Sequence, residues 1–371
     1  MTIKTAFSAD CLRLDAEVEI ERIAGRIREI VLRDLRRRGA VLGLSGGIDS
    51  SVTAALCVKA LGPEKVVGVL MPERDSEPES ADLAMTLAGM LGIDTVREDI
   101  APSLEAAGCY QRRDDFIRRL VPEYGEGWGS KVVLESALSG RGYSINWLVV
   151  QSPEGVQQKL RMPLDVYLGV IAAANMKQRT RKQIEYYHAD RLNYAVAGTP
   201  NRLEYDQGFF VKNGDGAADF KPIAHLYKSQ VYQLAEALGV PEEIRIRPPT
   251  TDTWSLPQTQ DEYYFALSHR DMDLCLHGLD NAVAAPEVAA AIGLAEAEVT
   301  AAWRDIEAKR KVAHYLHAAP RLIDADGPRL LRSGEAVADE AAPAFAPKPR
   351  HDRAAGADLG QNGRVAAGDQ H

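Results

Sequence analysis

Ala40-Val-Leu-Gly-Leu-Ser-Gly-Gly-Ile-Asp-Ser-Ser51 is the part of this sequence that says most about its fold. It begins as an apolar run that predicts a buried strand, breaks at two adjacent glycines, and continues into an apolar pattern of helical spacing. A strand, a glycine turn and a helix start together form an anion site, because the free N–H groups of the turn and the helix dipole both favour negative charge. Glycine also lets the main chain close around phosphate oxygens, and the neighbouring serines offer hydroxyl donors.

Asp49 distinguishes this loop from the Walker type, which places Gly-Lys-Ser/Thr after its second glycine. No lysine stands in the loop, and a carboxylate beside a polyphosphate would repel it unless a cation lay between them. Asp49 therefore implies Mg²⁺, which prefers oxygen ligands. An ordinary strand-to-helix turn, with Asp49 as a helix-start residue, is the alternative that the loop by itself leaves open.

Composition describes a soluble globular protein of 371 residues, with 46% hydrophobic and 26% charged residues. No apolar run reaches the length of a membrane span, and the N-terminus lacks the apolar core of a signal peptide, so we expect a cytoplasmic protein without a membrane partner. The four cysteines are scattered, which is typical of reduced thiols. A net charge of −9 argues against nucleic acid as a partner.

Strand and helix patterns alternate along the chain, which predicts an α/β fold with a doubly wound parallel sheet. Apolar runs of strand type are found at 40–45, 65–71, 95–100 and 192–197, and helical spacing at 13–39, 80–91, 163–187, 226–238 and 296–313. The helix at 163–187 turns basic in its second half, with Lys177, Arg179, Arg181 and Lys182, and taken alone this half is expected to be a solvated face.

The domain organisation that we expect is one catalytic domain over residues 1–323 and a disordered tail over 324–371. Beyond about Asp324 the composition shifts to Ala, Pro, Gly, Asp and Arg, which could not bury enough apolar surface to become ordered. Residues 104–162 form an insertion whose pattern fits either a lid or a dimer element, and the sequence does not choose between them.

Further motifs follow the phosphate loop in a fixed order. They are Asn175-Met-Lys-Gln-Arg-Thr-Arg181, Gly198-Thr-Pro-Asn-Arg-Leu-Glu204, Gly208-Phe-Phe-Val-Lys212, Gly214-Asp-Gly216 and Leu226-Tyr-Lys228. Together with the loop they resemble the NAD synthetases, the amide-forming branch of the PP-loop ATP pyrophosphatases. The resemblance covers residues 41–252 with an interruption at 104–162, and it implies the adenine nucleotide alpha hydrolase-like fold.

The resemblance also implies an activity. Family members join ammonia to the nicotinate carboxylate of deamido-NAD, with ATP as co-substrate and Mg²⁺ as cofactor, and they release AMP and pyrophosphate through an acyl-adenylate. They are homodimers whose deamido-NAD site draws on both subunits. No stretch of this chain resembles an attached glutaminase, so we expect free ammonia to be used, and a separate glutaminase partner is left open.

The roles of individual residues come from the same resemblance. It assigns the ATP phosphates to Gly43, Leu44, Ser45, Gly46, Gly47, Ile48, Asp49 and Ser50, further ATP contacts to Thr199, Lys228 and Thr250, Mg²⁺ to Asp49 and Glu204, catalysis to Asp49 and Lys228, and deamido-NAD binding to Arg179, Lys212 and Asp215.

Departures from the family pattern fall in the part that faces the carboxylate substrate. Pro200 interrupts one motif, the 104–162 segment is long, and His317 is followed by Ala318 where a His-Lys pair is expected near the C-terminal end. A PP-loop amide ligase that adenylates a different carboxylate is therefore the alternative function. A tRNA-modifying enzyme would need a basic RNA-binding domain, and a nucleotide-binding regulator would not need both metal ligands.

Overall fold

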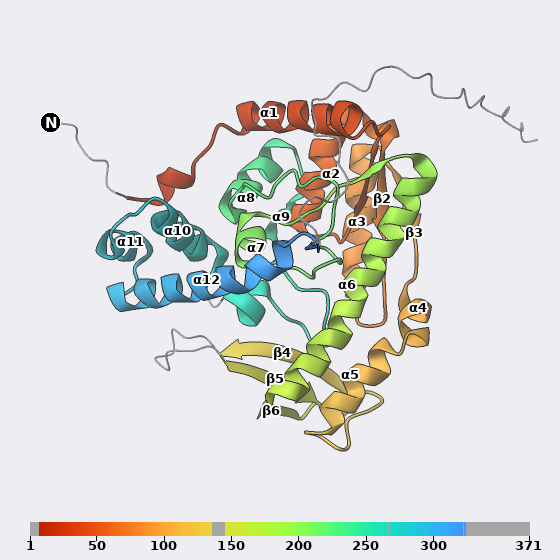
Figure 1. Ribbon diagram of the computed structural model, residues 1–371, viewed down its shortest axis with the longest axis vertical. Coiled ribbons are helices and arrows are strands. Elements are labelled where there is room, and N and C mark those ends of the chain that lie inside the picture. The colour runs from red at the N-terminus through yellow and green to blue at the C-terminus, as the bar shows by residue number, and fades with distance from the viewer. Residues whose placement is uncertain (1–6, 136–144, 266, 322, 324–371) are drawn as a thin grey trace, which may run out of the picture. The chain divides into compact units, whose positions relative to one another are not determined.

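A four-stranded parallel sheet lies at the centre of the chain in the computed structural model, which describes residues 7–135, 145–265, 267–321 and 323 (Figure 1). The strands are β1 (Ala40–Gly43), β2 (Val66–Leu70), β3 (Asp94–Arg97) and β7 (Ala195–Val196), in the order β3-β2-β1-β7. Because β1 pairs in parallel with both β2 and β7, the strand order reverses between β1 and β7. Ligands bind at such a reversal, outside the carboxyl ends of the strands.

Helices cover both faces of this sheet, which confirms the doubly wound arrangement. Leu42 packs with α1, α2, α3 and α8, whereas its neighbour Val41 packs with α6 and the helices that follow β3. Successive residues of a strand point to opposite faces, so β1 is buried on both sides. These helices are α1 (Ala16–Arg28), α2 (Ile48–Leu61), α3 (Pro78–Leu91), α6 (Leu164–Leu192) and α8 (Lys228–Ala237).

Strand β7 is shorter than the predicted run at 192–197. Leu192 is the last residue of α6, and Asn193 ends that helix in the left-handed conformation at φ 56°. Asparagine tolerates this conformation and closes helices in it. Beyond the strand, Ala197 still forms a parallel bridge to Phe220, so the polypeptide after β7 stays alongside the sheet.

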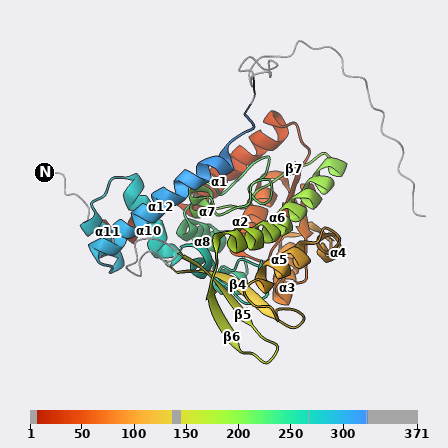
Figure 2. The same cartoon turned by 60° about the horizontal axis from the view of Figure 1, so that its bottom comes forward.

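The described residues of the 104–162 segment form helices and a second sheet. Two helices, α4 (Ala101–Ala106) and α5 (Cys109–Arg118), precede an antiparallel sheet of β4 (Gly129–Glu135), β5 (Ile145–Gln151) and β6 (Gln157–Arg161). Figures 1 and 2 show this sheet beside α5 and the N-terminal end of α6. It packs there through a core of its own, which includes Ile117, Leu148, Val166 and Val170.

Further helices follow α6 along the chain. α9 (Glu242–Ile246) packs through Ile244 into the cluster of α1, α2, α3 and α8, whereas α7 (Arg202–Gln207), α10 (His269–Asp280), α11 (Ala285–Ile292) and α12 (Glu296–His317) share a separate buried cluster. Leu203 of α7 shares a buried cluster with Met272, Leu276 and Ile306, so α7 is anchored on α10 and α12. The sequence predicted α12 but neither α10 nor α11, and the tail predicted over 324–371 lies outside the described residues.

Short turns complete the described chain. They are 3-10 turns over Ala9–Leu12 and Pro63–Lys65 and π-helical turns over Glu29–Asp34 and Asp261–Phe265. Among the described helices, none combines the length and the apolar character needed to cross a bilayer.

Candidate active site

The glycine turn after β1 has the conformation that an anion site requires. Gly46 lies at φ 72°, and a Cβ on it would stand 2.4 Å from the carbonyl oxygen of Ser80, so only glycine fits. Ser51 makes the first backbone hydrogen bond of α2, to the Gly47 carbonyl at 3.1 Å. The N–H groups of Ile48, Asp49 and Ser50 precede this bond at the start of the helix, and they are left for a ligand.

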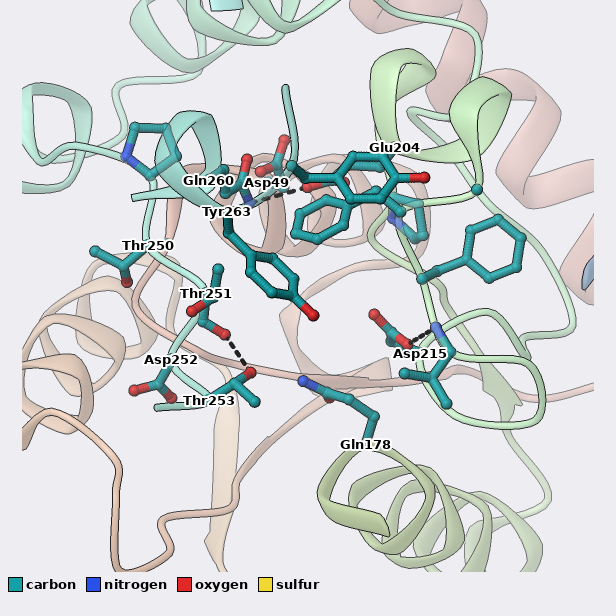
Figure 3. Close-up of a pocket in the computed structure, with 18 of the residues that line it drawn as sticks. Asp49, Gln178, Glu204, Asp215, Thr250, Thr251, Asp252, Thr253, Gln260 and Tyr263 are labelled. Atoms are coloured by element: carbon teal, nitrogen blue, oxygen red, sulfur yellow. Dashed lines mark hydrogen bonds between the residues drawn. The ribbon is translucent and has the colours of Figure 1, made fainter. Parts of the chain in front are cut away.

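Two adjoining cavities, of about 630 and 220 Å³, open beside this turn. The larger is lined by residues from the loop, from β4, β5, α6, α7 and α12, and from residues 248–264 (Figure 3). Predicted residues that line at least one cavity are Gly43, Leu44, Ser45, Gly47, Ile48, Asp49, Ser50, Thr199, Glu204, Asp215, Lys228 and Thr250. Sequence motifs that are far apart along the chain therefore converge on one site.

Asp49 and Glu204 are brought together by Asn201, the residue that caps α7. Its side-chain amide donates to Asp49 Oδ1 at 3.1 Å, and its backbone N–H donates to Glu204 Oε2 at 3.1 Å. Lys228, the first residue of α8, donates from Nζ to Asp49 Oδ2. Two carboxylates and one ammonium thus meet where the ends of β1 and β7 lead into helices, at the reversal of strand order.

The electrostatics of this group fit a divalent cation. Burial and the neighbouring charge of Asp49 raise the pKa of Glu204 to about 8. Burial by itself would lower the pKa of Lys228, but Asp49 and Glu204 hold it above its ordinary value. A cation between the carboxylates would remove the repulsion that raises the Glu204 pKa. No group of three or more His, Cys, Asp or Glu residues suited to a metal occurs in the described chain, so a cation here would take its other ligands from further oxygen donors, such as phosphate and water.

The substrate residues predicted from the resemblance are only partly brought together. Asp215 lines both cavities and accepts a hydrogen bond from the Val211 N–H at 2.7 Å, and burial raises its pKa. Arg179 is exposed, and its Nε donates to the Lys212 carbonyl at 3.2 Å. Neither Arg179 nor Lys212 lines either cavity.

Lys212 instead closes the last helix. Its Nζ donates to the carbonyl oxygens of Tyr315 at 2.8 Å and Ala318 at 3.0 Å, at the C-terminal end of α12. A cation suits that end of a helix, because the unpaired carbonyls carry partial negative charge.

Gly46 also lies outside the lining of both cavities, although its neighbours Ser45 and Gly47 line the larger one.

Residues 248–264 contribute groups that sequence reasoning missed, since only Thr250 was predicted there. Gln260 Nε2 donates to Glu204 Oε1 at 3.0 Å, and Figure 3 shows the two side chains meeting beside Asp49. Strand β4 holds this segment, because Ser255 Oγ accepts from Ser130 N–H at 2.8 Å and Lys131 pairs with Glu262 at 2.8 Å. Residues 248–264 show no helix or strand periodicity, so the sequence did not predict their position. Contacts with distant residues place them at the site.

α12 supplies a further charged pair to the larger cavity. Lys309 Nζ lies 2.6 Å from Asp305 Oδ2 and also donates to the Tyr264 carbonyl at 2.6 Å. Burial lowers the pKa of Lys309. In the sequence the two residues stand four apart on a predicted helix, which is the ordinary spacing of a surface ion pair. That spacing gave no signal of a site.

The basic half of α6 is only partly the solvated face that the sequence predicted: Arg179 is exposed, but Lys177 and Lys182 are buried. Lys177 is 1% exposed and its Nζ pairs with Glu73 at 2.9 Å and Asp75 at 2.7 Å. Arg113 of α5 pairs with the same Asp75 at 2.6 Å. Lys182 is also buried, beside Glu185 at 2.6 Å. Buried charges of this kind are tolerated only when paired. The Lys177 pairs join α6 to the residues after β2, whereas the Lys182–Glu185 pair lies within α6.

Comparison with known proteins gives a consistent result. The family model described as NAD synthase matches residues 19–119 and 153–313. An NH(3)-dependent NAD(+) synthetase of Rhizobium meliloti (strain 1021) is 64% identical over 320 residues, 86% of this chain and 96% of the relative. One of Rhizobium rhizogenes (strain K84 / ATCC BAA-868) is 60% identical over 323 residues, 87% of this chain and 97% of the relative.

Solved structures agree in fold. An NMN synthetase from Francisella tularensis has a TM-score of 0.58 at 22% identity, covering 84% of this chain and 99% of that chain. An NH3-dependent NAD synthetase from Campylobacter jejuni has a TM-score of 0.54 at 22% identity, covering 84% of this chain and 100% of that chain. Residues 120–152 of this chain lie outside the match to the family model, and strands β4 and β5 fall within them.

Proposed function

The chain belongs to the NAD synthase family, and from this membership together with the site we propose that it joins ammonia to deamido-NAD, converting ATP to AMP and pyrophosphate. The observation that carries the proposal is the pair of half-buried Asp49 and buried Glu204, linked through Asn201 beside the N–H groups at the start of α2. That arrangement suits a polyphosphate with a divalent cation and contains no Walker lysine.

The first chemical step activates the carboxylate. An oxygen of the nicotinate carboxylate attacks the α-phosphorus of ATP, the bond from that phosphorus to the bridging oxygen breaks, and pyrophosphate leaves with the electron pair. Mg²⁺ bound by Asp49 and Glu204 would offset phosphate charge. Lys228 keeps its charge at neutral pH because Asp49 and Glu204 raise its pKa, and so it can stabilise the departing pyrophosphate.

The second step forms the amide. Ammonia adds to the acyl carbon, the bond from that carbon to the phosphate oxygen breaks, and AMP leaves with the electron pair while the new ammonium group loses a proton. AMP is a far better leaving group than the oxygen of a free carboxylate, which is why ATP is consumed before ammonia reacts. The cavity must hold both substrates in line for these steps.

We further propose a homodimer. Arg179 is exposed on α6 and lies outside both cavities. If it binds deamido-NAD, as the family resemblance implies, it would contact the substrate bound by a second subunit. Near the N-terminal end of the same helix Leu164 is 71% and Leu168 55% exposed, an apolar surface that a partner helix could cover. Sedimentation of the purified protein tests the assembly, and a monomer at the concentration where it is active would exclude a shared site.

The function is tested by incubating the purified chain with ATP, Mg²⁺, ammonium and deamido-NAD, and measuring NAD, AMP and pyrophosphate. We expect all three products in equal amounts and no ADP. Production of ADP would overturn the pyrophosphatase class. Normal ATP binding without NAD, combined with pyrophosphate release stimulated by other carboxylates, would favour the alternative ligase.

A further inference from the structure

Gln178 of α6 lies where the two cavities of the site join. It lines both of them, together with Ser45 and Ser50 of the phosphate loop and with Asp215. The smaller cavity continues toward the end of β2, and the larger toward β4, β5 and α12. A side chain at this junction therefore lies between the groups that hold ATP phosphates and the space left for a second substrate.

The Gln178 amide points into this space and makes no hydrogen bond to the described residues. Figure 3 shows the side chain extending from α6 into the cavity. Within the described part of the chain its amide has no hydrogen-bond partner, whereas the nearby Asp215 and Thr253 each have one. Gln178 is half-buried, and its amide offers two donors and an acceptor to a ligand in the cavity.

The stem of Gln178 is held in place by the loop after α7. A Cβ on Gly214 would lie 3.0 Å from the Gln178 Cβ and 3.1 Å from its carbonyl carbon, so the loop backbone packs directly on this turn of α6. The same loop carries Asp215. Packing of this kind restricts the rotamers of Gln178 and leaves its terminal amide as the part that can reach a ligand.

We propose that Gln178 donates a hydrogen bond from Nε2 to the carboxyl oxygen of the substrate that does not attack ATP. The inference rests on the proposed function. That oxygen becomes the carbonyl of the acyl-adenylate, and it takes up negative charge when ammonia adds to the acyl carbon. A neutral amide suits this position, because a donor fixed toward developing charge stabilises the transition state without neutralising the attacking oxygen.

Other groups at the junction suit the role less well. Asp215 and Asp252 line both cavities, but their carboxylates would repel a carboxylate substrate. Lys228 lines only the larger cavity and is bound to Asp49. Arg181 lines only the smaller cavity, with its Nη2 3.7 Å from Asp252 Oδ2.

The test compares Gln178→Met, which keeps the length of the side chain and removes its donors, with the wild type. We expect kcat for NAD synthesis to fall by about 10²-fold, the effect of losing one oxyanion donor, while KM for ATP is unchanged. Exchange of labelled pyrophosphate into ATP, which requires deamido-NAD and stops at the adenylate, should fall less than synthesis. Gln178→Asn, which keeps the amide on a shorter stem, should retain more activity than Gln178→Met.

Gln111→Met is the matched control, because Gln111 is exposed on α5 and lines neither cavity. It should behave as the wild type, and circular dichroism should show all variants folded. An unchanged kcat in Gln178→Met, or a rise in KM for ATP alone, would overturn the inference. If the wild type itself makes no NAD, the proposed function fails first, so the two failures are distinguishable.

Discussion

Asp49 and Glu204 are the two residues to which we assign binding of the cation. Glu204 is buried, receives hydrogen bonds from Asn201 and Gln260, and has a pKa raised to about 8 by burial and by Asp49. A buried acid in this state destabilises the fold when ionised. Its presence in a cavity is therefore explained better by a ligand than by stability.

We predict that Asp49→Asn and Glu204→Gln each lower kcat by about 10²-fold or more, because either change leaves phosphate charge uncompensated. Glu204→Gln should keep or raise the free energy of unfolding, since it removes a buried ionisable group. Steady-state rates at saturating Mg²⁺ and urea unfolding measure the two effects. Glu243→Gln, at an exposed position of α9, is the control, and near-wild-type turnover by either site variant would contradict its role.

At the scale of elements, helix starts place the functional groups. α2 begins at the glycine turn, α7 begins after Asn201, and α8 begins with Lys228. The start of α8 is fixed from another element, because Asp273 of α10 accepts hydrogen bonds from the backbone N–H of Lys228 at 3.2 Å and of Ser229 at 2.7 Å. The contact sets where the Lys228 side chain leaves the helix.

Asp273 should make stability depend on pH. Burial raises its pKa from 3.8 to about 6, so the folded protein holds a proton that the unfolded chain releases at lower pH. This contribution is complete below the unfolded pKa and is lost as pH rises through the folded value. Between about pH 4.5 and about pH 7, the wild type should lose roughly 2 kcal/mol of unfolding free energy relative to Asp273→Asn.

Urea unfolding of both proteins across that range measures the difference. Comparing the two proteins cancels the titration of all other groups, including the carboxylates whose paired cations lower their pKa. A constant difference between wild type and Asp273→Asn would show that Asp273 stays ionised throughout, because the two backbone N–H groups and the Ser229 hydroxyl that donate to it outweigh burial. In that event the pKa of Asp273 is not raised, but its hydrogen bonds to the start of α8 are unaffected.

For the whole molecule, we predict that ammonia and not glutamine supports synthesis. Releasing ammonia from glutamine with a cysteine nucleophile needs a thiolate of low pKa. Burial raises the pKa of Cys57 and of Cys275 to about 12, and it also raises the pKa of Cys11 and Cys109. NAD formation with glutamine in ammonium-free buffer should therefore be absent for the purified chain, and robust synthesis would contradict this.

Removal of residues 324–371 should leave kcat and both KM values unchanged. The family match ends at residue 313, and the residues that line the site end at Leu316. The composition of the tail argues against a packed structure of its own. Steady-state kinetics of the shortened protein, with thermal unfolding as the check on folding, decides the matter. A large loss of turnover in a normally folded protein would show that the tail contributes to catalysis.

Local patterns in the sequence determined the phosphate loop, the parallel sheet and the helices around it. The loop is predictable because its chemistry lies within a few consecutive residues, from Gly43 to Ser50, and because strands and helices have short periods. The order of the later motifs then identified the family. All of these features can be predicted without knowing which segments are in contact.

Tertiary structure decided which polar side chains face the site. Lys177 is buried because Glu73 and Asp75 lie beside it, although they are distant in sequence. Lys212 closes α12 instead of lining a cavity, while Gln178 and Gln260 reach the site from positions without any motif of their own. A helix presents different residues to different neighbours at each turn, so only the packing of distant segments determines whether a charged or amide group meets solvent, a partner or a substrate.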